Sequence, residues 1–332
     1  MKTLLITRTI AEPVVAQARG MFAVTVGSAP LSEDQAAQAL TQYDAILPTL
    51  GDNFTAAAFD TAVQAGIRCR MLGNFGVGYS HIDVAAARAA GVAVSNTPDV
   101  LTDATADLGW TLILATARRA GEGERMLRAG QWAGFGPKGM LGTHVTGKVL
   151  GIVGMGRIGQ AVARRGHFGF GMPVVYFNRS AKAVDFPARQ LPHLHDVMAA
   201  ADFVVVTVPG GVENTRLIDA AALAAMKPSG IFVNIARGEV VDEAALIAVL
   251  AAGRIAGAGL DVFEKEPYVP PALIALENCV LLPHLGSATV ETRQAMAQLA
   301  LDNIIAWSQG QALLTGVQGG SAPVPAGLPR DI

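Results

Sequence analysis

The 332-residue sequence predicts an α/β fold made of two doubly wound parallel-sheet domains, and three observations lead to this prediction. The chain is too long for one hydrophobic core of ordinary size. Short apolar runs alternate along it with Ala-rich stretches of helical character. The apolar runs lack polar–apolar alternation, which is typical of strands covered by helices on both faces. We place the division between the two domains near residue 100.

The expected strands fall into two series. The first is Thr3–Ile6, Phe22–Val26, Ala45–Leu47, Arg68–Leu72 and Val92–Val94. The second is Val149–Val153, Val174–Phe177, Phe203–Thr207, Ile231–Asn234, Gly257–Leu260 and Val280–Leu282. Helical stretches lie between the strands, for example Ser32–Leu40, Asp83–Ala90 and Asp242–Leu250. We also expect one long helix over Leu101–Arg128, a loop over Gly130–Gly142 and a mobile tail over Gly319–Ile332.

Composition narrows the class of protein. Hydrophobic residues make up 51% of the chain and charged residues 16%, which is typical of a compact enzyme. A formal net charge of -2 gives no basic excess for nucleic acid or an anionic membrane. Cys69 and Cys279 lie in apolar runs outside any CxxC pair, so we expect two buried thiols in a reducing compartment. No apolar run has the length of a signal-peptide core or a membrane span, and we predict a cytoplasmic protein.

The strongest local motif begins at the end of the strand Val149–Val153. It reads Gly154-Met155-Gly156-Arg157-Ile158-Gly159, a GxGxxG pattern between a strand and a helix. Gly154 permits a tight turn, Gly156 lets the backbone approach a pyrophosphate, and Gly159 lets the helix pack against the strand. The positive end of the helix dipole then faces the phosphates. The motif predicts dinucleotide binding; the alternative is a glycine-rich turn without a ligand.

The residues after the next strand bear on which dinucleotide binds. An acidic residue at this point usually binds the 2′-hydroxyl of NAD. Here Asn178 takes that place, and Arg179, Ser180 and Lys182 follow. An acidic residue would repel a 2′-phosphate, whereas these side chains can bind one. We therefore favour NADPH over NADH, with solvated loop charges as the alternative for Arg179 and Lys182.

Four ionisable residues follow strands further along the chain, where open α/β sheets bind ligands. They are Arg237, Asp261, Glu266 and His284. A nicotinamide cofactor transfers a hydride, and when the acceptor is a keto carbon its oxygen gains negative charge. A histidine suits the role of proton donor to that oxygen near neutral pH. A carboxylate beside it would orient the ring and favour its charged form. An arginine can bind a substrate carboxylate through two N–H groups.

These motifs resemble the D-isomer-specific 2-hydroxyacid dehydrogenase family. The resemblance runs from the Gly73–Gly78 segment to about Trp307. It is carried by the GxGxxG motif and by the segments 234–238, 259–267 and 282–289, which read NIARG, GLDVFEKEP and LPHLGSAT around Arg237, Asp261, Glu266 and His284. The combination is specific, and it implies reduction of a 2-keto acid to a 2-hydroxy acid with NAD(P)H.

The resemblance also implies a role for each site residue. Arg237 would bind substrate, and His284, paired with Glu266, would be the acid/base that also contacts substrate. The N–H groups of Val77 and Gly78 would hold the substrate carboxylate; an ordinary strand-to-helix turn is the alternative. Asp261 would lie on the nicotinamide side. The further cofactor contacts implied are Arg157, Ile158, Pro209, Ile235 and Gly286.

Within the family, the segment 96–108 and the basic loop after residue 177 resemble the glyoxylate/hydroxypyruvate reductase branch. Gly210 and Gly211 stand where many relatives carry Leu-Thr, so this chain lacks the side chains that those relatives place near the expected cofactor path. Trp132 and Phe135, in the loop after the long helix, either cap a substrate site or pack against that helix.

The family's layout implies two interrupted domains and a homodimer. Residues 1–99 plus 287–332 would form a flavodoxin-like substrate-binding domain, and residues 100–286 a Rossmann NAD(P)-binding domain. The helix from Leu101 would serve dimerisation. We expect no metal: His193 and His195 lack a third ligand at suitable spacing.

Three alternatives stay open. The first is a broader 2-keto acid or 2-ketoaldonate reductase, and the second an enzyme acting on phosphorylated hydroxy acids. The third is an NAD(H)-sensing binding protein, since some relatives of this fold act as corepressors.

Overall fold

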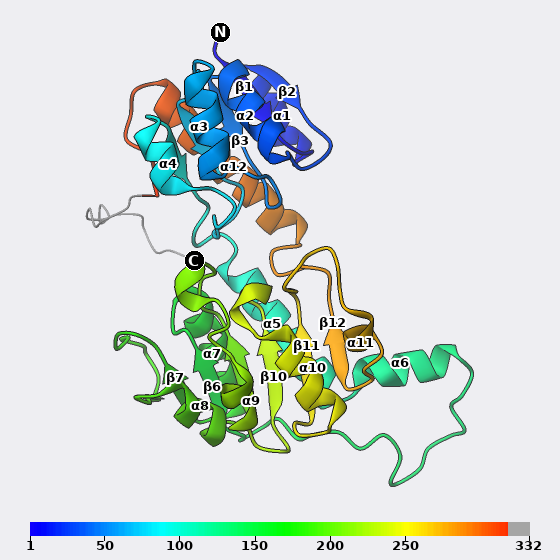
Figure 1. The fold of residues 1–332 in the computed structure, drawn as a ribbon. Helices are drawn as coiled ribbons and strands as arrows, with labels where there is room; N and C mark the ends of the chain where they lie inside the picture. The colour runs from blue at the N-terminus through cyan, green and yellow to red at the C-terminus, as the bar shows by residue number, and fades with distance from the viewer. Residues whose placement is uncertain (318–332) are drawn as a thin grey trace. The chain divides into compact units, whose positions relative to one another are not determined.

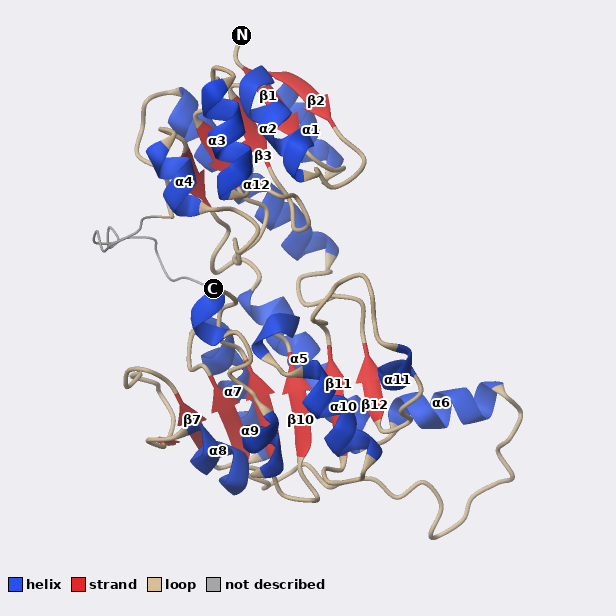
Figure 2. Ribbon diagram, in the orientation of Figure 1, coloured by secondary structure: helices blue, strands red, loops and turns tan. Residues whose placement is uncertain are grey.

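The computed structural model describes residues 1–317, and the predicted tail Gly319–Ile332 lies outside these residues. The chain divides into two compact units, Met1–Val100 with Val290–Ile332, and Leu101–Thr289. Each unit is a parallel sheet with helices on both faces (Figures 1 and 2). The predicted fold class is therefore confirmed. None of the helices in the described part of the chain is long and apolar enough to cross a membrane.

Unit 1 carries a five-stranded sheet in the order β2-β1-β3-β4-β5, the flavodoxin-like order. Its strands are β1 (Thr3–Ile6), β2 (Ala23–Val26), β3 (Ala45–Leu47), β4 (Met71–Gly73) and β5 (Ala93–Ser95). Its helices are α1 (Glu12–Arg19), α2 (Glu33–Gln42), α3 (Ala56–Gln64), α4 (Val84–Ala89) and α12 (Val290–Ser308). Alternate strand residues face opposite helices: Leu5 joins the core under α2 and α3, and Leu4 joins the core under α1 and α12.

Unit 2 carries a seven-stranded parallel sheet in the order β12-β11-β10-β9-β6-β7-β8. The strands are β6 (Leu150–Val153), β7 (Val174–Phe177), β8 (Ala188–Gln190), β9 (Phe203–Val206), β10 (Ile231–Asn234), β11 (Gly257–Leu260) and β12 (Cys279–Leu281). The helices are α5 (Thr102–Ala117), α6 (Ala120–Arg128), α7 (Arg157–Phe170), α8 (Leu194–Ala200), α9 (Ala220–Ala224), α10 (Glu243–Ala251) and α11 (Pro271–Ile274), with short 3-10 turns η1 (Val212–Asn214) and η2 (Gly238–Val240).

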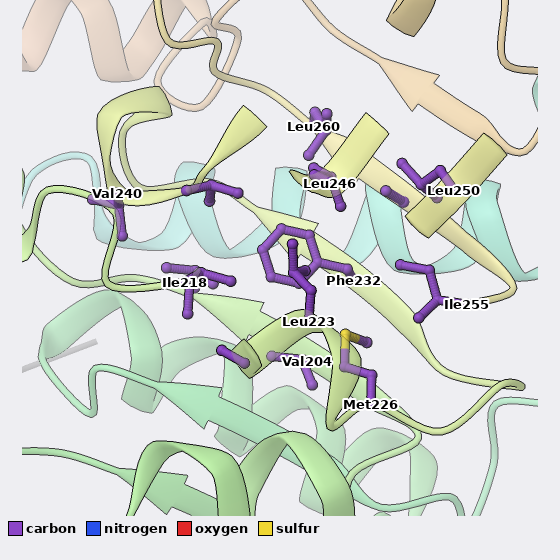
Figure 3. Close-up of a cluster of buried hydrophobic side chains, with 14 of the residues drawn as sticks. Val204, Ile218, Leu223, Met226, Phe232, Val240, Leu246, Leu250, Ile255 and Leu260 are labelled. Carbon is purple, nitrogen blue, oxygen red and sulfur yellow. The ribbon is translucent and has the colours of Figure 1, made fainter. Parts of the chain in front are cut away.

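Two cores hold unit 2 together, one on each face of its sheet. Phe232 is fully buried and packs with Leu223 of α9 and Leu246 of α10 (Figure 3). Its neighbours in β10, Ile231 and Val233, face the other way, into the core that α5 and α7 cover. Because helices cover both faces, the strands are apolar throughout, as the sequence predicts.

The predicted helix over Leu101–Arg128 is wrong as one element. It breaks at Arg119, whose φ of 52° is left-handed, and α5 and α6 lie on either side. Gly121 and Gly123 weaken helix propensity just after the break, and Arg119 pairs with Glu122 at 2.6 Å. The loop after α6 carries no regular structure, as predicted.

Smaller differences concern the strands. Strand β8 was not predicted; it is a three-residue edge strand that contains the polar residues Arg189 and Gln190. The strands predicted over Arg68–Leu72 and Val92–Val94 are shorter or shifted, as β4 and β5. Both cysteines are buried, as predicted, and burial raises the pKa of Cys69 to about 12 and that of Cys279 to about 11.

Candidate active site

The glycine turn between β6 and α7 has the geometry that its three glycines predict. Gly154 has a φ of 100°, and a Cβ there would meet the Val208 nitrogen at 2.8 Å. A Cβ on Gly159 would lie 2.2 Å from the Gly154 oxygen, so the helix packs directly on the turn. A Cβ on Gly156 would meet nothing within 4 Å. Two glycines thus serve close packing, and the third keeps the helix N-terminus open.

This turn fits a dinucleotide. Gly156 is the N-cap of the 14-residue helix α7 and offers no side chain to its first N–H groups. Uncapped N–H groups at a helix N-terminus bind phosphate oxygens. Arg157 is exposed and Ile158 half-buried, both in the first turn of α7. Within residues 1–317, no group of three or more His, Cys, Asp or Glu side chains has the arrangement of a metal site.

The loop after β7 is held by Asn178. Its Oδ1 accepts from the Met155 N–H at 3.2 Å, and its Nδ2 donates to the Ser180 carbonyl at 2.7 Å. The side chain that stands where NAD-binding folds carry an acid therefore ties this loop to the glycine turn. Ser180 and Lys182 are exposed. Arg179, also exposed, forms an ion pair with Glu213 of η1 at 2.9 Å.

The predicted catalytic residues come together at one edge of the sheet of unit 2. Strands β10, β11 and β12 are parallel neighbours, so their carboxyl ends lie side by side. Arg237, Asp261 and His284 each follow one of these strands within three residues. This is the edge at which open α/β sheets bind ligands.

His284 and Glu266 form a hydrogen-bonded pair. The distance from His284 Nδ1 to Glu266 Oε2 is 2.8 Å, and both side chains are about one-third exposed or less, at 27% and 30%. Burial alone would raise the pKa of Glu266, but the hydrogen bond from His284, together with its charge and the Phe263 N–H, holds this pKa below the ordinary value. Within residues 1–317, His284 Nε2 has no hydrogen-bond partner. The arrangement can therefore orient the ring and leave Nε2 for proton transfer.

Asp261 holds the backbone that carries His284. Its Oδ1 accepts from the Leu285 N–H at 2.6 Å and its Oδ2 from the Gly286 N–H at 2.8 Å. The Asp261 carbonyl also accepts from the His284 N–H at 2.9 Å, and His284 has a left-handed φ of 55°. Burial raises the pKa of Asp261, and the two N–H groups act against that shift. Both carboxylate oxygens of Asp261 thus fix the loop 284–286.

Arg237 lies among negatively charged side chains, and most of its guanidinium N–H groups form no hydrogen bond within residues 1–317. Its Nη1 donates to the Ala236 carbonyl at 2.7 Å, the one hydrogen bond that its guanidinium forms within residues 1–317. Burial lowers the pKa of Arg237, and the negative charges of Glu266, Glu239 and Asp261 oppose that shift. A half-buried guanidinium with unused N–H groups can bind a planar anion such as a carboxylate.

Sequence reasoning missed Glu239, although the paired glycines after Pro209 were a signal. Glu239 Oε1 accepts from the Gly211 N–H at 2.6 Å. A Cβ on Gly210 would lie 2.5 Å from that same Oε1 and 3.0 Å from Cγ of Arg237. The missing side chain at position 210 therefore gives Glu239 its room beside Arg237.

Three further predicted cofactor contacts lie at this edge of unit 2. Pro209 is exposed, directly after β9 and Val208. Ile235 is buried, with its Cδ1 3.0 Å from where a Cβ on Gly109 would lie. Gly286 is also buried, and a Cβ there would meet Asp261 Oδ2 at 3.2 Å.

The predicted carboxylate loop belongs to unit 1 and follows β4. Val77 and Gly78 are half-buried. Within residues 1–317, their backbone N–H groups form no hydrogen bond. Two adjacent N–H groups without an internal partner can bind an anion.

Known proteins are similar to this chain over most of its length. Residues 110–286 match the D-isomer specific 2-hydroxyacid dehydrogenase, NAD binding domain. The chain is 44% identical over 314 residues to the glyoxylate reductase of Thermococcus kodakarensis, covering 92% of this chain and 93% of that protein. It is 45% identical over 285 residues to glyoxylate/hydroxypyruvate reductase B of Serratia proteamaculans, covering 84% and 86%.

A solved structure shows the same similarity. The NADPH-dependent glyoxylate/hydroxypyruvate reductase from Sinorhizobium meliloti, in complex with NADP and malonate, superposes with a TM-score of 0.84 at 37% identity, covering 95% of this chain and 96% of that one. Family match, relatives and glycine turn together assign an NAD or NADP cofactor and an oxidoreductase activity. The chain therefore belongs to the D-isomer-specific 2-hydroxyacid dehydrogenase family of NAD(P)-dependent oxidoreductases.

Proposed function

We propose that this protein reduces the small 2-keto acids glyoxylate and hydroxypyruvate to their 2-hydroxy acids, prefers NADPH, and uses His284 as its acid/base. The observation that carries the proposal is the hydrogen bond between His284 Nδ1 and Glu266 Oε2 at 2.8 Å, near a guanidinium with unused donors. The names of the relatives from Thermococcus kodakarensis and Serratia proteamaculans support the choice of substrates.

The chain's own residues have distinct tasks in this proposal. Arg237 binds the substrate through its free N–H groups, and the N–H groups of Val77 and Gly78 hold the substrate carboxylate. When bound, the reduced nicotinamide supplies the hydride. His284, oriented by the ionised Glu266, holds a proton at Nε2 and donates it to the keto oxygen as charge develops there. Asp261 keeps the backbone of His284 in place through the Leu285 and Gly286 N–H groups.

The preference for NADPH rests on the loop after β7. Arg179, Ser180 and Lys182 are all exposed and offer donors to a 2′-phosphate. Glu213 already pairs with Arg179 at 2.9 Å, which indicates that this guanidinium is within reach of an anion. The NADPH-dependent relative from Sinorhizobium meliloti agrees with the preference. The other proposed contacts to the cofactor are Gly154, Gly156, Arg157, Ile158, Gly159, Asn178, Pro209, Ile235, Asp261 and Gly286.

We propose one role for each of the two domains. Residues 1–99 plus 287–332 are assigned to substrate binding and residues 100–286 to cofactor binding. We also propose a homodimer and retain the cytoplasm as the predicted location.

The experiment follows the loss of NADPH and NADH absorbance in parallel, with glyoxylate, hydroxypyruvate and pyruvate as substrates. We expect faster oxidation of NADPH than of NADH with the first two. A preference for NADH would overturn the role of Arg179 and Lys182. Inactivity with all three substrates would overturn the substrate assignment and direct the search to larger 2-keto acids.

A further inference from the structure

Side-chain amides hold every carbonyl of the loop 76–78. Asn74 Nδ2 donates to the carbonyls of Gly76 and Gly78, both at 3.0 Å. Asn96 Nδ2 donates to the carbonyl of Val77 at 2.8 Å. Three consecutive carbonyl groups of this half-buried loop are thus bound by two asparagines, neither of which was predicted as a site residue.

Both asparagines are themselves fixed at the ends of neighbouring strands. Asn74 follows β4 and is fully buried, and its N–H donates to the Ser95 carbonyl at 2.9 Å. Asn96 follows β5, and its carbonyl accepts from the Thr315 hydroxyl at 2.6 Å. Because β4 and β5 are parallel neighbours, the two amides approach the loop from one edge of the sheet.

The direction of each carbonyl decides the direction of an N–H group. In a planar trans peptide, the C=O of one residue and the N–H of the next point in opposite directions. The Gly76 carbonyl shares its peptide with the Val77 N–H, and the Val77 carbonyl shares its peptide with the Gly78 N–H. Asn74, together with the Thr97 N–H that donates to the same Gly76 carbonyl at 3.0 Å, therefore turns the Val77 N–H away from the core of unit 1. Asn96 does the same for the Gly78 N–H.

We propose that Asn74 and Asn96 are positioning residues for the substrate carboxylate: they set the direction of the Val77 and Gly78 N–H groups. The inference rests on the proposed role of those two N–H groups. An amide suits the task better than a carboxylate for two reasons. It can donate to a carbonyl, and it brings no negative charge next to an anionic substrate. A hydrogen bond at the carbonyl also polarises the peptide, which strengthens its N–H as a donor.

The test compares glyoxylate with glyoxylamide, its neutral amide, in Asn74→Ala and Asn96→Ala. We expect kcat/KM for glyoxylate to fall about tenfold or more in each variant, mainly through KM. The reason is that the charge-assisted hydrogen bonds from the Val77 and Gly78 N–H groups to the substrate carboxylate are lost. Activity with glyoxylamide should change by less than about threefold, since neutral hydrogen bonds are weaker. KM for NADPH should stay at its wild-type value.

A core variant of unit 1, Phe59→Leu, is the control for a merely structural effect. Phe59 is 1% exposed on α3, outside the loop. We expect Phe59→Leu to lower the unfolding temperature and leave the ratio of glyoxylate to glyoxylamide activity unchanged. Asn96 is only half-buried, so Asn96→Ala decides the question if Asn74→Ala does not fold.

Two results would overturn the inference. If the asparagine variants lose activity with glyoxylate and glyoxylamide in parallel, the side chains support the fold alone. If the wild-type enzyme itself does not favour glyoxylate over glyoxylamide, the proposed carboxylate contact fails, and the inference fails with it. The wild-type ratio thus separates the two failures.

Discussion

At the scale of single residues, the site depends on how Glu266 stays ionised while partly buried. Burial alone would raise its pKa, but His284 and the Phe263 N–H lower it overall. A carboxyl with a depressed pKa keeps its charge down to a lower pH than an ordinary glutamate. The pairing with His284 is therefore available at neutral and mildly acidic pH and is lost as the pH falls through the lowered pKa.

Replacing Glu266 by Gln should slow the chemical step. The amide keeps the shape of the side chain but carries no charge to stabilise a protonated imidazole, so we expect kcat to fall about 10²-fold, within the range of general acid–base effects. The pH–rate profile is the measurement: wild-type activity should fall as the pH falls through the lowered pKa of Glu266, and this acid limb should be absent from the variant, because the amide does not titrate. Glu264→Gln, two residues earlier and 3.8 Å from Arg216, is the matched control. Equal kcat in wild type and Glu266→Gln would exclude this role.

The pair Arg179–Glu213 makes a second prediction at this scale. Arg179→Ala should raise KM for NADPH about tenfold and leave KM for NADH nearly unchanged, because only NADPH carries the 2′-phosphate. Glu213→Gln should have the opposite, smaller effect, about twofold, since ion pairs this exposed are weak.

Steady-state kinetics with both cofactors checks the Arg179–Glu213 prediction. In the double variant, the effect of Glu213→Gln should vanish, because the residue competes only for Arg179. Parallel changes for NADPH and NADH would show that the two side chains are ordinary surface charges.

At the scale of elements, two glycines in the turn from β6 to α7 allow the effects of packing and of cofactor binding to be tested separately. Gly159→Ala should destabilise the fold by several kcal/mol, since its Cβ would lie 2.2 Å from a backbone oxygen. Gly156→Ala has open space around its Cβ and should leave the thermal unfolding temperature within about 2 °C of wild type. Its methyl group would instead hinder the proposed approach of the pyrophosphate, so KM for both cofactors should rise.

Thermal unfolding and cofactor KM, measured on both variants, check this pair of predictions. A Gly156→Ala enzyme with unchanged cofactor KM would mean that the helix N-terminus does not contact the phosphates.

Most of the elements could be predicted because their causes are local. The apolar runs that form β6, β9 and β10, and the glycine turn, can be recognised in the amino-acid sequence. The wrong predictions concern features that depend on contacts between residues of the folded chain. The break at Arg119 depends on a left-handed residue held by Glu122, and β8 is a short polar strand that exists through its pairing with β7.

The same distinction applies to the site. Residues directly after strands, such as Arg237 and His284, could be found from the motif alone. Glu239 and Asn74 could not, because each acts on a backbone group across a turn, and only the folded chain shows which group that is. The clamp that Asp261 forms on Leu285 and Gly286 was missed for the same reason.

At the scale of the whole molecule, α6 and the loop after it present apolar side chains that nothing in the described chain covers. No residue of α6 is buried. Leu127 is 60% exposed, Trp132 61%, Phe135 91% and Leu141 66%. The alternative in which the two aromatics pack against the long helix is therefore wrong within this chain. Figure 2 shows α6 beyond the β12 edge of its sheet, followed by the long loop. Large apolar side chains exposed along one segment of the chain are typical of a protein interface.

The proposed homodimer makes the last prediction. Leu127→Glu combined with Trp132→Ser should convert the dimer to a monomer, because a buried charge and a lost aromatic contact each weaken an apolar interface by several kcal/mol. Light scattering after size exclusion gives the mass of each form against the 34.3 kDa of one chain. Phe168→Ser, at a residue 60% exposed on α7, is the control and should remain dimeric. A wild-type protein that runs as a monomer, or a double variant that stays dimeric, would exclude this surface as the interface. If the monomer forms and loses activity with glyoxylate while its cofactor KM is unchanged, Trp132 or Phe135 contributes to the substrate site of the dimer.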